Sequence, residues 1–223
     1  MKRLTLALAL ALVSVSFCFT TWAFASGDNK YYSEFTFKHK LNDKFDLFFT
    51  PEIRLNEDMG SFYYYQLRLG SAFHTHRNLD LALAYRFIQN KVNDEWEGND
   101  IQYIEMLFIP KIKLDRFDVS DANKIERRFY ESVPDRWMYR NLLLVAYPTK
   151  IGNFEFAPYI SDEIYYDFEI DKMNLNWVTV GANKKINKYF TVGFYYRDET
   201  SRVGISSKWV TNHILGTNVT VVF

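Results

Sequence analysis

Apolar and polar residues alternate along nearly the whole chain beyond residue 25, and this period of two restricts the fold more than any other feature. In one run, Phe45, Leu47 and Phe49 alternate with Asp46 and Thr50. Successive side chains of a β-strand point to opposite faces, so the alternation indicates strands with one apolar and one polar face. We count about eleven such runs of roughly ten residues, and the apolar spacing of helices is almost absent. The sequence therefore predicts an all-β domain.

The first 25 residues have the features of a secretory signal peptide. Lys2 and Arg3 precede an apolar run over residues 4–19, and residues 23–25 form a small-x-small cleavage site. An apolar run of about 16 residues is short for a membrane-spanning helix, which disfavours an N-terminal anchor. We expect residues 1–25 to be removed and residues 26–223 to form the exported domain.

Charge and cysteine content exclude several classes of protein. With 27 basic and 27 acidic residues, the chain has no net charge and lacks the basic excess of a nucleic-acid binder. Its single cysteine, Cys18, excludes a disulfide scaffold and a cysteine-rich metal site. No phosphate-binding glycine loop or cofactor fingerprint is present, so no cofactor is expected. The exported domain is therefore periplasmic, secreted or an outer-membrane barrel.

Tight turns and longer polar links follow each other along the chain, which is the asymmetry of an outer-membrane barrel. The tight turns are expected near residues 42–43, 76–78, 149–153 and 187–188, and the longer links at 56–61, 90–100, 167–174 and 198–208. A strand of about ten residues, tilted by about 40°, crosses roughly 25 Å of hydrocarbon. The pattern predicts an antiparallel up-and-down transmembrane β-barrel of ten to twelve strands.

A soluble barrel also alternates, with its apolar face turned inward. Two features favour a membrane barrel instead. Charged residues occur in mid-strand on the polar face, where a narrow lumen would hold them: Arg54, Arg68, Arg86, Glu126, Arg128, Arg140, Glu163 and Arg197. Aromatic residues gather near strand ends, as in interfacial girdles: Tyr31, residues 63–65, Trp137, Tyr139, Tyr147, Trp177, Phe190 and Trp209.

The last strand, residues 213–223, supports the same interpretation. Phe223, Val221 and Val219 form an apolar face that ends on an aromatic residue, like the C-terminal signal read by the barrel-assembly machinery. Single-chain bacterial barrels have even strand numbers, so we expect ten or twelve strands rather than the eleven runs. Either one run is counted in excess, or a strand is missed near residues 26–30 or 199–208.

Several segments in order resemble a family of small Gram-negative outer-membrane β-barrel proteins known only as a domain of unknown function. The matching pieces are residues 125–129 (IERRF), Arg136, Arg140, Tyr147-Pro148 and residues 158–164 (PYISDEI), with similar pieces at 51–55 (PEIRL) and 195–197 (YYR). The resemblance implies an outer-membrane barrel with no assigned activity. Its surroundings would then be outer-membrane lipid and lipopolysaccharide.

Pairing the strands around residues 133–134 and 151–152 predicts an ion-pair cluster in the lumen. We expect Glu126 and Glu163 each to lie opposite Arg140, with Arg128 and Ser161 close by. Further lumen-facing charges are expected at Arg54, Arg68, Arg86 and Arg197. The cluster is interpreted as a structural plug, a path for small solutes, or a catalytic site.

Three functions remain open from the sequence. The first is an outer-membrane barrel, structural or a narrow small-solute pore, and not an enzyme. The second is an outer-membrane enzyme acting on lipids through Ser161 or His213, although Ser207 lies about 20 Å along the strand from His213. The third is a soluble periplasmic barrel that holds an apolar ligand. The sequence does not indicate an oligomeric state, and His74 and His76 are interpreted as rim residues rather than metal ligands.

Overall fold

The computed structural model describes residues 27–92, 95–96, 101–130, 134–152, 154–202 and 208–223. The predicted signal peptide, residues 1–25, lies outside the described residues. All secondary structure in the described part is β, which confirms the all-β class. No helix there is long and apolar enough to cross a membrane.

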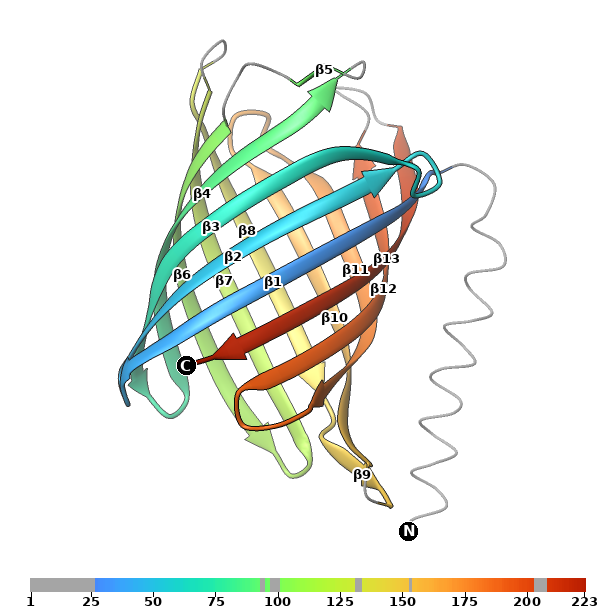
Figure 1. Ribbon diagram of the computed structural model, residues 1–223. Helices are drawn as coiled ribbons and strands as arrows, with labels where there is room; N and C mark the ends of the chain where they lie inside the picture. Colours follow the sequence, from blue (N-terminus) through green and yellow to red (C-terminus); the bar gives the residue numbers. More distant parts are fainter. Residues whose placement is uncertain (1–26, 93–94, 97–100, 131–133, 153, 203–207) are drawn as a thin grey trace.

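Within the described residues, eleven long strands form the wall of a barrel, and two short strands lie at its ends (Figure 1). The long strands are β1 (Asn29–Asn42), β2 (Phe45–Asn56), β3 (Ser61–His76), β4 (Leu79–Val92), β6 (Ile101–Leu114), β7 (Phe117–Phe129), β8 (Arg136–Ala146), β10 (Phe154–Asp167), β11 (Lys172–Lys185), β12 (Phe190–Arg202) and β13 (Trp209–Val222). The short strands are β5 (Glu95–Trp96) and β9 (Thr149–Ile151).

Each long strand pairs antiparallel with the next one along the chain, and β13 pairs with β1 to close the barrel. An odd number of strands leaves the first and last running in the same direction, so β1 and β13 pair in parallel. Their register runs from Asn29 opposite His213 to Lys38 opposite Val222. The range of ten to twelve strands is confirmed, but the expectation of an even number is wrong, because all eleven runs are strands.

The two ends of the barrel differ in their connections. At the end drawn lowest in Figure 1, short turns at residues 43–44, 77–78 and 115–116 join the strands, and β9 and the C-terminus also lie there. The turn at 115–116, where Asp115 has a φ of 54°, was not among the turns expected from sequence. We call this the short-turn end, and the opposite end, where β5 lies, the long-loop end.

Apolar side chains cover the outside of the barrel, and charged side chains line its inside. Leu69, Leu83 and Phe194 point outward and are 60%, 54% and 65% exposed. Buried charged and polar side chains point inward on most strands, including Glu52, Arg86, Glu105, Lys124, Glu126, Arg140, Glu163 and Glu199. The alternation therefore places the polar face of each strand in the lumen, which is the reverse of a soluble barrel with an apolar centre.

Glycines on the inner wall allow aromatic rings to lie flat against it. A Cβ at Gly216 would lie 2.0 Å from the ring of Tyr195, and one at Gly181 would lie 2.7 Å from the ring of Tyr159. In both cases the ring belongs to the residue directly opposite on the neighbouring strand. These rings therefore cover the wall of the barrel rather than project across the lumen.

Candidate functional site

Arg140 on β8 lies at the centre of an ion-paired group inside the barrel. Its Nη1 donates a hydrogen bond of 2.7 Å to Oε1 of Glu126 on β7, and its Nε donates one of 3.0 Å to Oε1 of Glu163 on β10. Arg128 donates to the other oxygen of Glu126 at 2.7 Å. Glu126 is 0% exposed and Arg140 and Glu163 are each 6% exposed, so these charges are held away from water.

A second carboxylate extends this group to three more strands. Glu105 on β6 is 0% exposed and forms ion pairs with Arg86 on β4 and with Arg68 on β3, the latter at 2.8 Å. Lys124 on β7 lies 4.0 Å from Glu105 and 3.8 Å from Glu126. The ammonium of Lys124 therefore joins the two carboxylates into one network across the inner wall.

Arg54 on β2 is held differently, between aromatic rings. Its guanidinium lies 4.3 Å from the ring centre of Tyr32 and 4.0 Å from that of Tyr64, and it pairs with Glu52 two residues before it. Arginine packs on aromatic faces because its planar, weakly hydrated charge is attracted to the ring face. Gln66 donates to the second oxygen of Glu52 at 2.7 Å, which satisfies that carboxylate.

Trp177 on β11 links these groups across the lumen. Its ring lies 4.2 Å from the guanidinium of Arg197, 5.7 Å from that of Arg54 and 5.8 Å from that of Arg140. Its Nε1 donates a hydrogen bond of 3.1 Å to Glu199, which also pairs with Lys30 at 2.9 Å. We call the whole assembly the ion-pair layer; its members are Lys30, Glu52, Arg54, Arg68, Arg86, Glu105, Lys124, Glu126, Arg128, Arg140, Glu163, Trp177, Arg197 and Glu199.

The local sequence builds this layer through period-two spacing. Glu52 and Arg54 are two residues apart on one strand, as are Lys124, Glu126 and Arg128 on another, so each set shares the inner face. Closure of the barrel then brings the inner faces of distant strands together. Arginine and glutamate reach across a narrow lumen because their side chains are long.

The strand registers differ from those expected. Lys124, not Glu126, lies opposite Arg140, and Tyr165, not Glu163, lies opposite it on the other side. Both expected pairings are therefore wrong by two residues. A shift of two residues keeps every side chain on its face, so Arg140 still reaches both carboxylates along the diagonal.

The structure brings most of the predicted site residues into the ion-pair layer. They are Glu126, Arg128, Arg140, Glu163, Arg54, Arg68, Arg86 and Arg197. Ser161 lies on the inner face, opposite Thr179 and Leu144, and is 7% exposed. The predicted assembly residues Val219 and Val221 lie on the outer face of β13, and Phe223 directly follows this strand. All three lie beside the seam, which is the parallel pairing of β13 with β1.

Six members of the layer are not among the site residues predicted from sequence: Lys30, Glu52, Glu105, Lys124, Trp177 and Glu199. Glu105 and Lys124 lie on predicted polar faces and could have been found by extending the period of two through residues 101–131. Trp177 was assigned to an interfacial girdle, which is wrong, because it points inward and is 8% exposed. Trp137 and Trp209, by contrast, point outward and are 41% and 37% exposed.

Ser161 and His213 lie on opposite sides of the barrel wall. Ser161 faces the lumen, whereas His213 is on the outer face, where its Nδ1 lies 2.7 Å from the hydroxyl of Tyr196 and 2.9 Å from Asp198. The two residues therefore do not form one site. In the part of the chain that is described, no group of three or more His, Cys, Asp or Glu side chains is placed to hold a metal ion.

Comparison with models of known protein families shows to which family the chain belongs. The model of a family described as "Protein of unknown function (DUF2490)" matches residues 29–204, from the start of β1 to beyond the end of β12. The chain belongs to this family. The resemblance found in the sequence, to a domain of unknown function, is thereby confirmed, and the family brings no assigned activity.

Among curated proteins, no match to this chain was found. Among solved structures, it is similar to an anion-selective porin from Comamonas acidovorans, with 12% sequence identity and a TM-score of 0.38. The similarity covers 79% of this chain and 57% of the porin. The chain thus spans a little over half the length of that porin, and a likeness at this level does not extend to function.

Proposed function

We propose that this protein spans the outer membrane of a Gram-negative cell as a narrow β-barrel that passes small solutes poorly. The observation that supports membrane insertion is the outer surface, where large apolar side chains such as Leu69, Leu83 and Phe194 are more than half exposed. In water such a surface is unfavourable, whereas in a bilayer it meets hydrocarbon. The outward Trp137 and Trp209 fit the interfacial positions of such a barrel.

The buried ion-pair layer is the observation that supports a restricted lumen. A water-filled channel would leave its lining charges exposed, yet Glu105 and Glu126 are 0% exposed and Arg140 is 6% exposed. The ring of Trp177 also contacts guanidinium groups from three different strands, those of Arg54, Arg140 and Arg197, so the layer extends across the lumen. Passage through the barrel would therefore require ion pairs in the layer to separate.

The remaining parts of the proposal concern export and surroundings. Residues 1–25 would direct export and be cleaved, and the face of Val219, Val221 and Phe223 would be read by the barrel-assembly machinery. Outer-membrane lipid and lipopolysaccharide would surround the apolar exterior. No nucleic acid or cofactor takes part, and no enzymatic step is assigned.

Two measurements test the proposal separately. Membrane insertion predicts that the protein is extracted only with detergent and that unheated samples migrate faster on gels than heated ones. Recovery of folded protein in the soluble fraction without detergent would overturn insertion. Restricted passage predicts rare openings of low conductance in planar lipid bilayers, and steady conductance like that of a wide general porin would overturn the restriction.

A lipid-modifying enzyme receives no support from the site geometry, because Ser161 and His213 are separated by the barrel wall. A soluble barrel with an apolar ligand at its centre is disfavoured by the distribution of charge, since the carboxylates and guanidinium groups lie inside. We therefore propose the membrane barrel alone.

A further inference from the structure

The ion-pair layer occupies only the half of the lumen nearer the long-loop end, and the other half has a different lining. Glu105, Glu126 and Glu163 each lie closer along their strands to the long-loop end than to the short-turn end. Toward the short-turn end, many inward-facing residues are small, including Gly70, Ala72, Ala82, Ala122, Ala146, Ala157, Gly181, Gly193 and Gly216. The rings of Phe48, Tyr159 and Tyr195 fill the space over Gly70, Gly181 and Gly216, and the hollow in this half of the lumen is the space that these side chains leave free.

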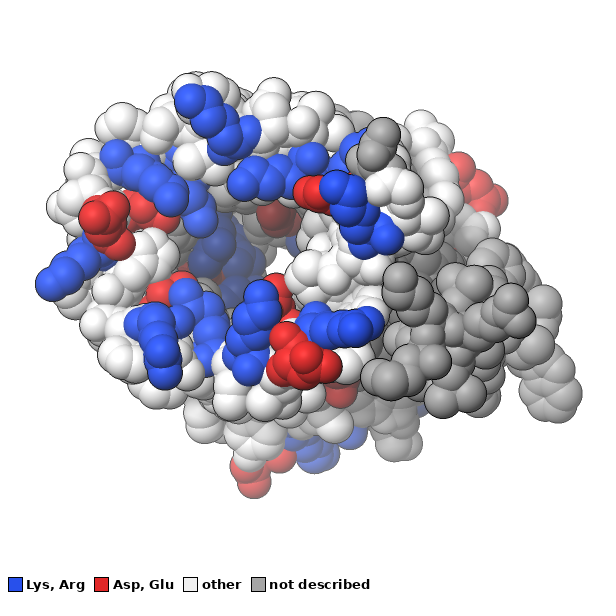
Figure 2. Space-filling model, turned by 90° about the horizontal axis from the view of Figure 1, so that it is seen from below, with Lys and Arg blue, Asp and Glu red and all other residues white. Residues whose placement is uncertain are grey.

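The hollow opens at the short-turn end. Figure 2 looks onto this end and shows Lys and Arg side chains around a central hollow. On one wall a cavity of about 780 Å³ is lined by residues that include Arg77, Lys111, Lys113, Ser120 and Leu144. A second cavity of about 530 Å³, at the short-turn ends of β9 to β12, is lined by residues that include Lys150, Glu155, Ala157, Asn183 and Lys185. We call the hollow with its two cavities the cup; volumes of this size are typical of small-molecule sites.

One wall of the cup is apolar, which is unexpected in a lumen otherwise lined by charges. Ile109 on β6, Ala122 on β7 and Leu142 on β8 lie side by side on the inner face. Ala122 is opposite Leu142, and Ile109 follows Phe108, whose partner is Asn123. Leu107 and Leu144 extend the patch along β6 and β8. The four aliphatic residues are partly exposed, in contrast to the buried layer beside them. Exposed aliphatic side chains inside a polar cavity indicate contact with an apolar ligand group.

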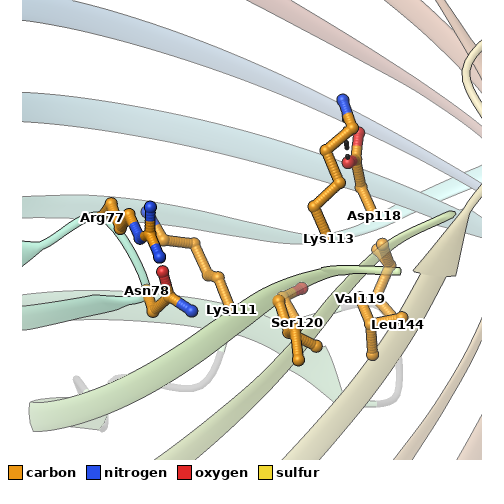
Figure 3. Close-up of a pocket in the computed structure, with 9 residues that line it drawn as sticks. Arg77, Asn78, Lys111, Lys113, Asp118, Val119, Ser120 and Leu144 are labelled. Carbon is orange, nitrogen blue, oxygen red and sulfur yellow. Dashed lines mark ion pairs between the residues drawn. The ribbon is translucent and has the colours of Figure 1, made fainter. Parts of the chain in front are cut away.

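The mouth of the cup has an excess of positive charge. The carboxylates of the cup are already engaged: Asp80 lies 2.7 Å from Lys111, Asp46 lies 3.0 Å from His74, and Glu155 lies 2.8 Å from Lys150. Asp118 lies 3.7 Å from Lys113 (Figure 3). Three further cations, Lys40, Arg77 and Lys185, are exposed and form no ion pair with any described residue. Cations at the mouth of a cleft attract anions and can bind them in place.

From these two linings we infer that the cup binds an anionic amphiphile, a single acyl chain that bears a carboxylate. The acyl chain would lie on the patch of Leu107, Ile109, Leu142 and Leu144. The carboxylate would lie at the mouth, where Arg77 and Lys113 line one cavity of the cup and Lys185 lines the other. The layer beyond the patch would stop the chain from passing further. This inference goes beyond the proposed function and does not depend on whether the barrel conducts.

The order of linings along the lumen selects this ligand over a simple anion. A small hydrophilic anion would use the cations at the mouth but leave the aliphatic patch in contact with water. A cationic amphiphile would cover the patch but be repelled at the mouth. Only a molecule with a negative head and an apolar tail satisfies both linings at once.

The test uses the nearly cysteine-free sequence. Cys18 is the single native cysteine, so the full chain with Cys18→Ser and Ala122→Cys carries one thiol within the apolar patch. The rate of its modification by a neutral, water-soluble thiol reagent is measured on protein in lipid nanodiscs. A ligand in the cup covers the thiol, so dodecanoate at ten times its dissociation constant slows the reaction by about tenfold, by mass action.

Other probes and variants separate the possible outcomes. Butyrate, which has the head without the tail, and dodecyltrimethylammonium, which has the tail with the opposite charge, are expected to leave the rate unchanged. Combined Arg77→Gln and Lys185→Gln substitutions are expected to weaken protection by dodecanoate. The matched substitutions Lys44→Gln and Lys188→Gln, in turns at the same end, are expected not to.

Three results would overturn the inference. An unchanged rate with dodecanoate would show that the cup holds no such ligand. Equal protection by butyrate would show an anion site without a place for the tail, and equal protection by dodecyltrimethylammonium would show that the charge is irrelevant. A separate control variant, Cys18→Ser with Asn187→Cys, carries its single thiol in the turn between β11 and β12. It reports any general effect of the amphiphile on the reagent, and its modification rate is expected not to change.

Discussion

Nη1 of Arg140 donates a hydrogen bond of 2.7 Å to Oε1 of Glu126, although the residue directly opposite Arg140 on β7 is Lys124. The contact is thus diagonal rather than across the ladder. It places a carboxylate between two cations, since Lys124 lies 3.8 Å from the same oxygen. Glu163 neutralises Arg140 from the other side at 3.0 Å. The guanidinium of Arg140 thereby links its own strand, β8, to β7 and β10.

Replacement of Arg140 by Met is expected to destabilise the barrel strongly. The substitution keeps an unbranched apolar stem but removes the guanidinium, which leaves Glu126 and Glu163 buried with fewer partners. Removing one member of a buried ion pair costs about 3–5 kcal/mol, because the charge that remains is not solvated. The free energy of unfolding in urea, measured on protein refolded into lipid vesicles, gives this value directly.

The control for Arg140→Met is Lys150→Met in the hairpin of β9 and β10. The ion pair of Lys150 with Glu155 is 2.8 Å long, but its side chains are 55% and 69% exposed. An exposed pair contributes little, and the expected change is below about 1 kcal/mol. Equal effects of the two substitutions would contradict the burial of charge in the ion-pair layer.

Trp177→Ala is expected to raise the conductance of single barrels in planar bilayers. The indole contacts the guanidinium groups of Arg54, Arg140 and Arg197, so its loss leaves a gap at the point where opposite walls meet. Stability should fall as well, by about 3–5 kcal/mol, as for other buried tryptophans replaced by alanine. Trp137→Ala serves as the control, because Trp137 points outward and is 41% exposed. If both variants conduct as the unaltered protein does, Trp177 does not restrict the lumen.

The fold followed from the sequence because period-two alternation is a local property that one chain displays in full. The alternation set which side chains face the lumen, and it placed Arg140, Glu126 and Glu163 on one face. The register did not follow, because a slip of two residues preserves the alternation and changes only which residues are opposite. Contact survived the slip since arginine reaches a diagonal neighbour as well as a direct one.

Strand number and the role of Trp177 could not be derived from the pattern. The even-number rule holds for barrels whose first and last strands pair antiparallel, and the parallel pairing of β1 with β13 removes that requirement. Trp177 lies near a strand end, as girdle residues do, but its position on the polar face placed it inside. For Trp177, the alternation along the strand predicts the side of the wall correctly, whereas the residue type does not.

Gly216→Ala is expected to destabilise the barrel although it adds only one carbon atom. The new Cβ would lie 2.0 Å from the ring of Tyr195, which is closer than packed atoms allow. Overpacking of this kind typically costs about 1–3 kcal/mol, because the ring must leave its rotamer. The double substitution Gly216→Ala with Tyr195→Ala removes the clash, so it should be less destabilised than the sum of the two single changes. Simple additivity in urea unfolding would show that the ring does not lie on this glycine.

Phe223→Ala is expected to lower the amount of barrel assembled in the outer membrane without weakening the folded barrel. The ring of Phe223 is 63% exposed on the outer surface, so its removal changes the free energy of unfolding by less than about 0.5 kcal/mol. Its backbone holds the seam, since its N–H donates to the carbonyl of Lys38 at 2.8 Å and its carbonyl accepts from Lys40 at 3.2 Å. Alanine at position 223 retains both backbone hydrogen bonds.

Phe194→Ala, which removes a ring that is 65% exposed in mid-wall, is the matched control for Phe223→Ala. Assembly is measured as heat-modifiable protein in outer-membrane fractions, and refolding as yield in detergent. A parallel loss of refolding yield in the Phe223 variant would assign the ring to the fold instead of to recognition by the assembly machinery.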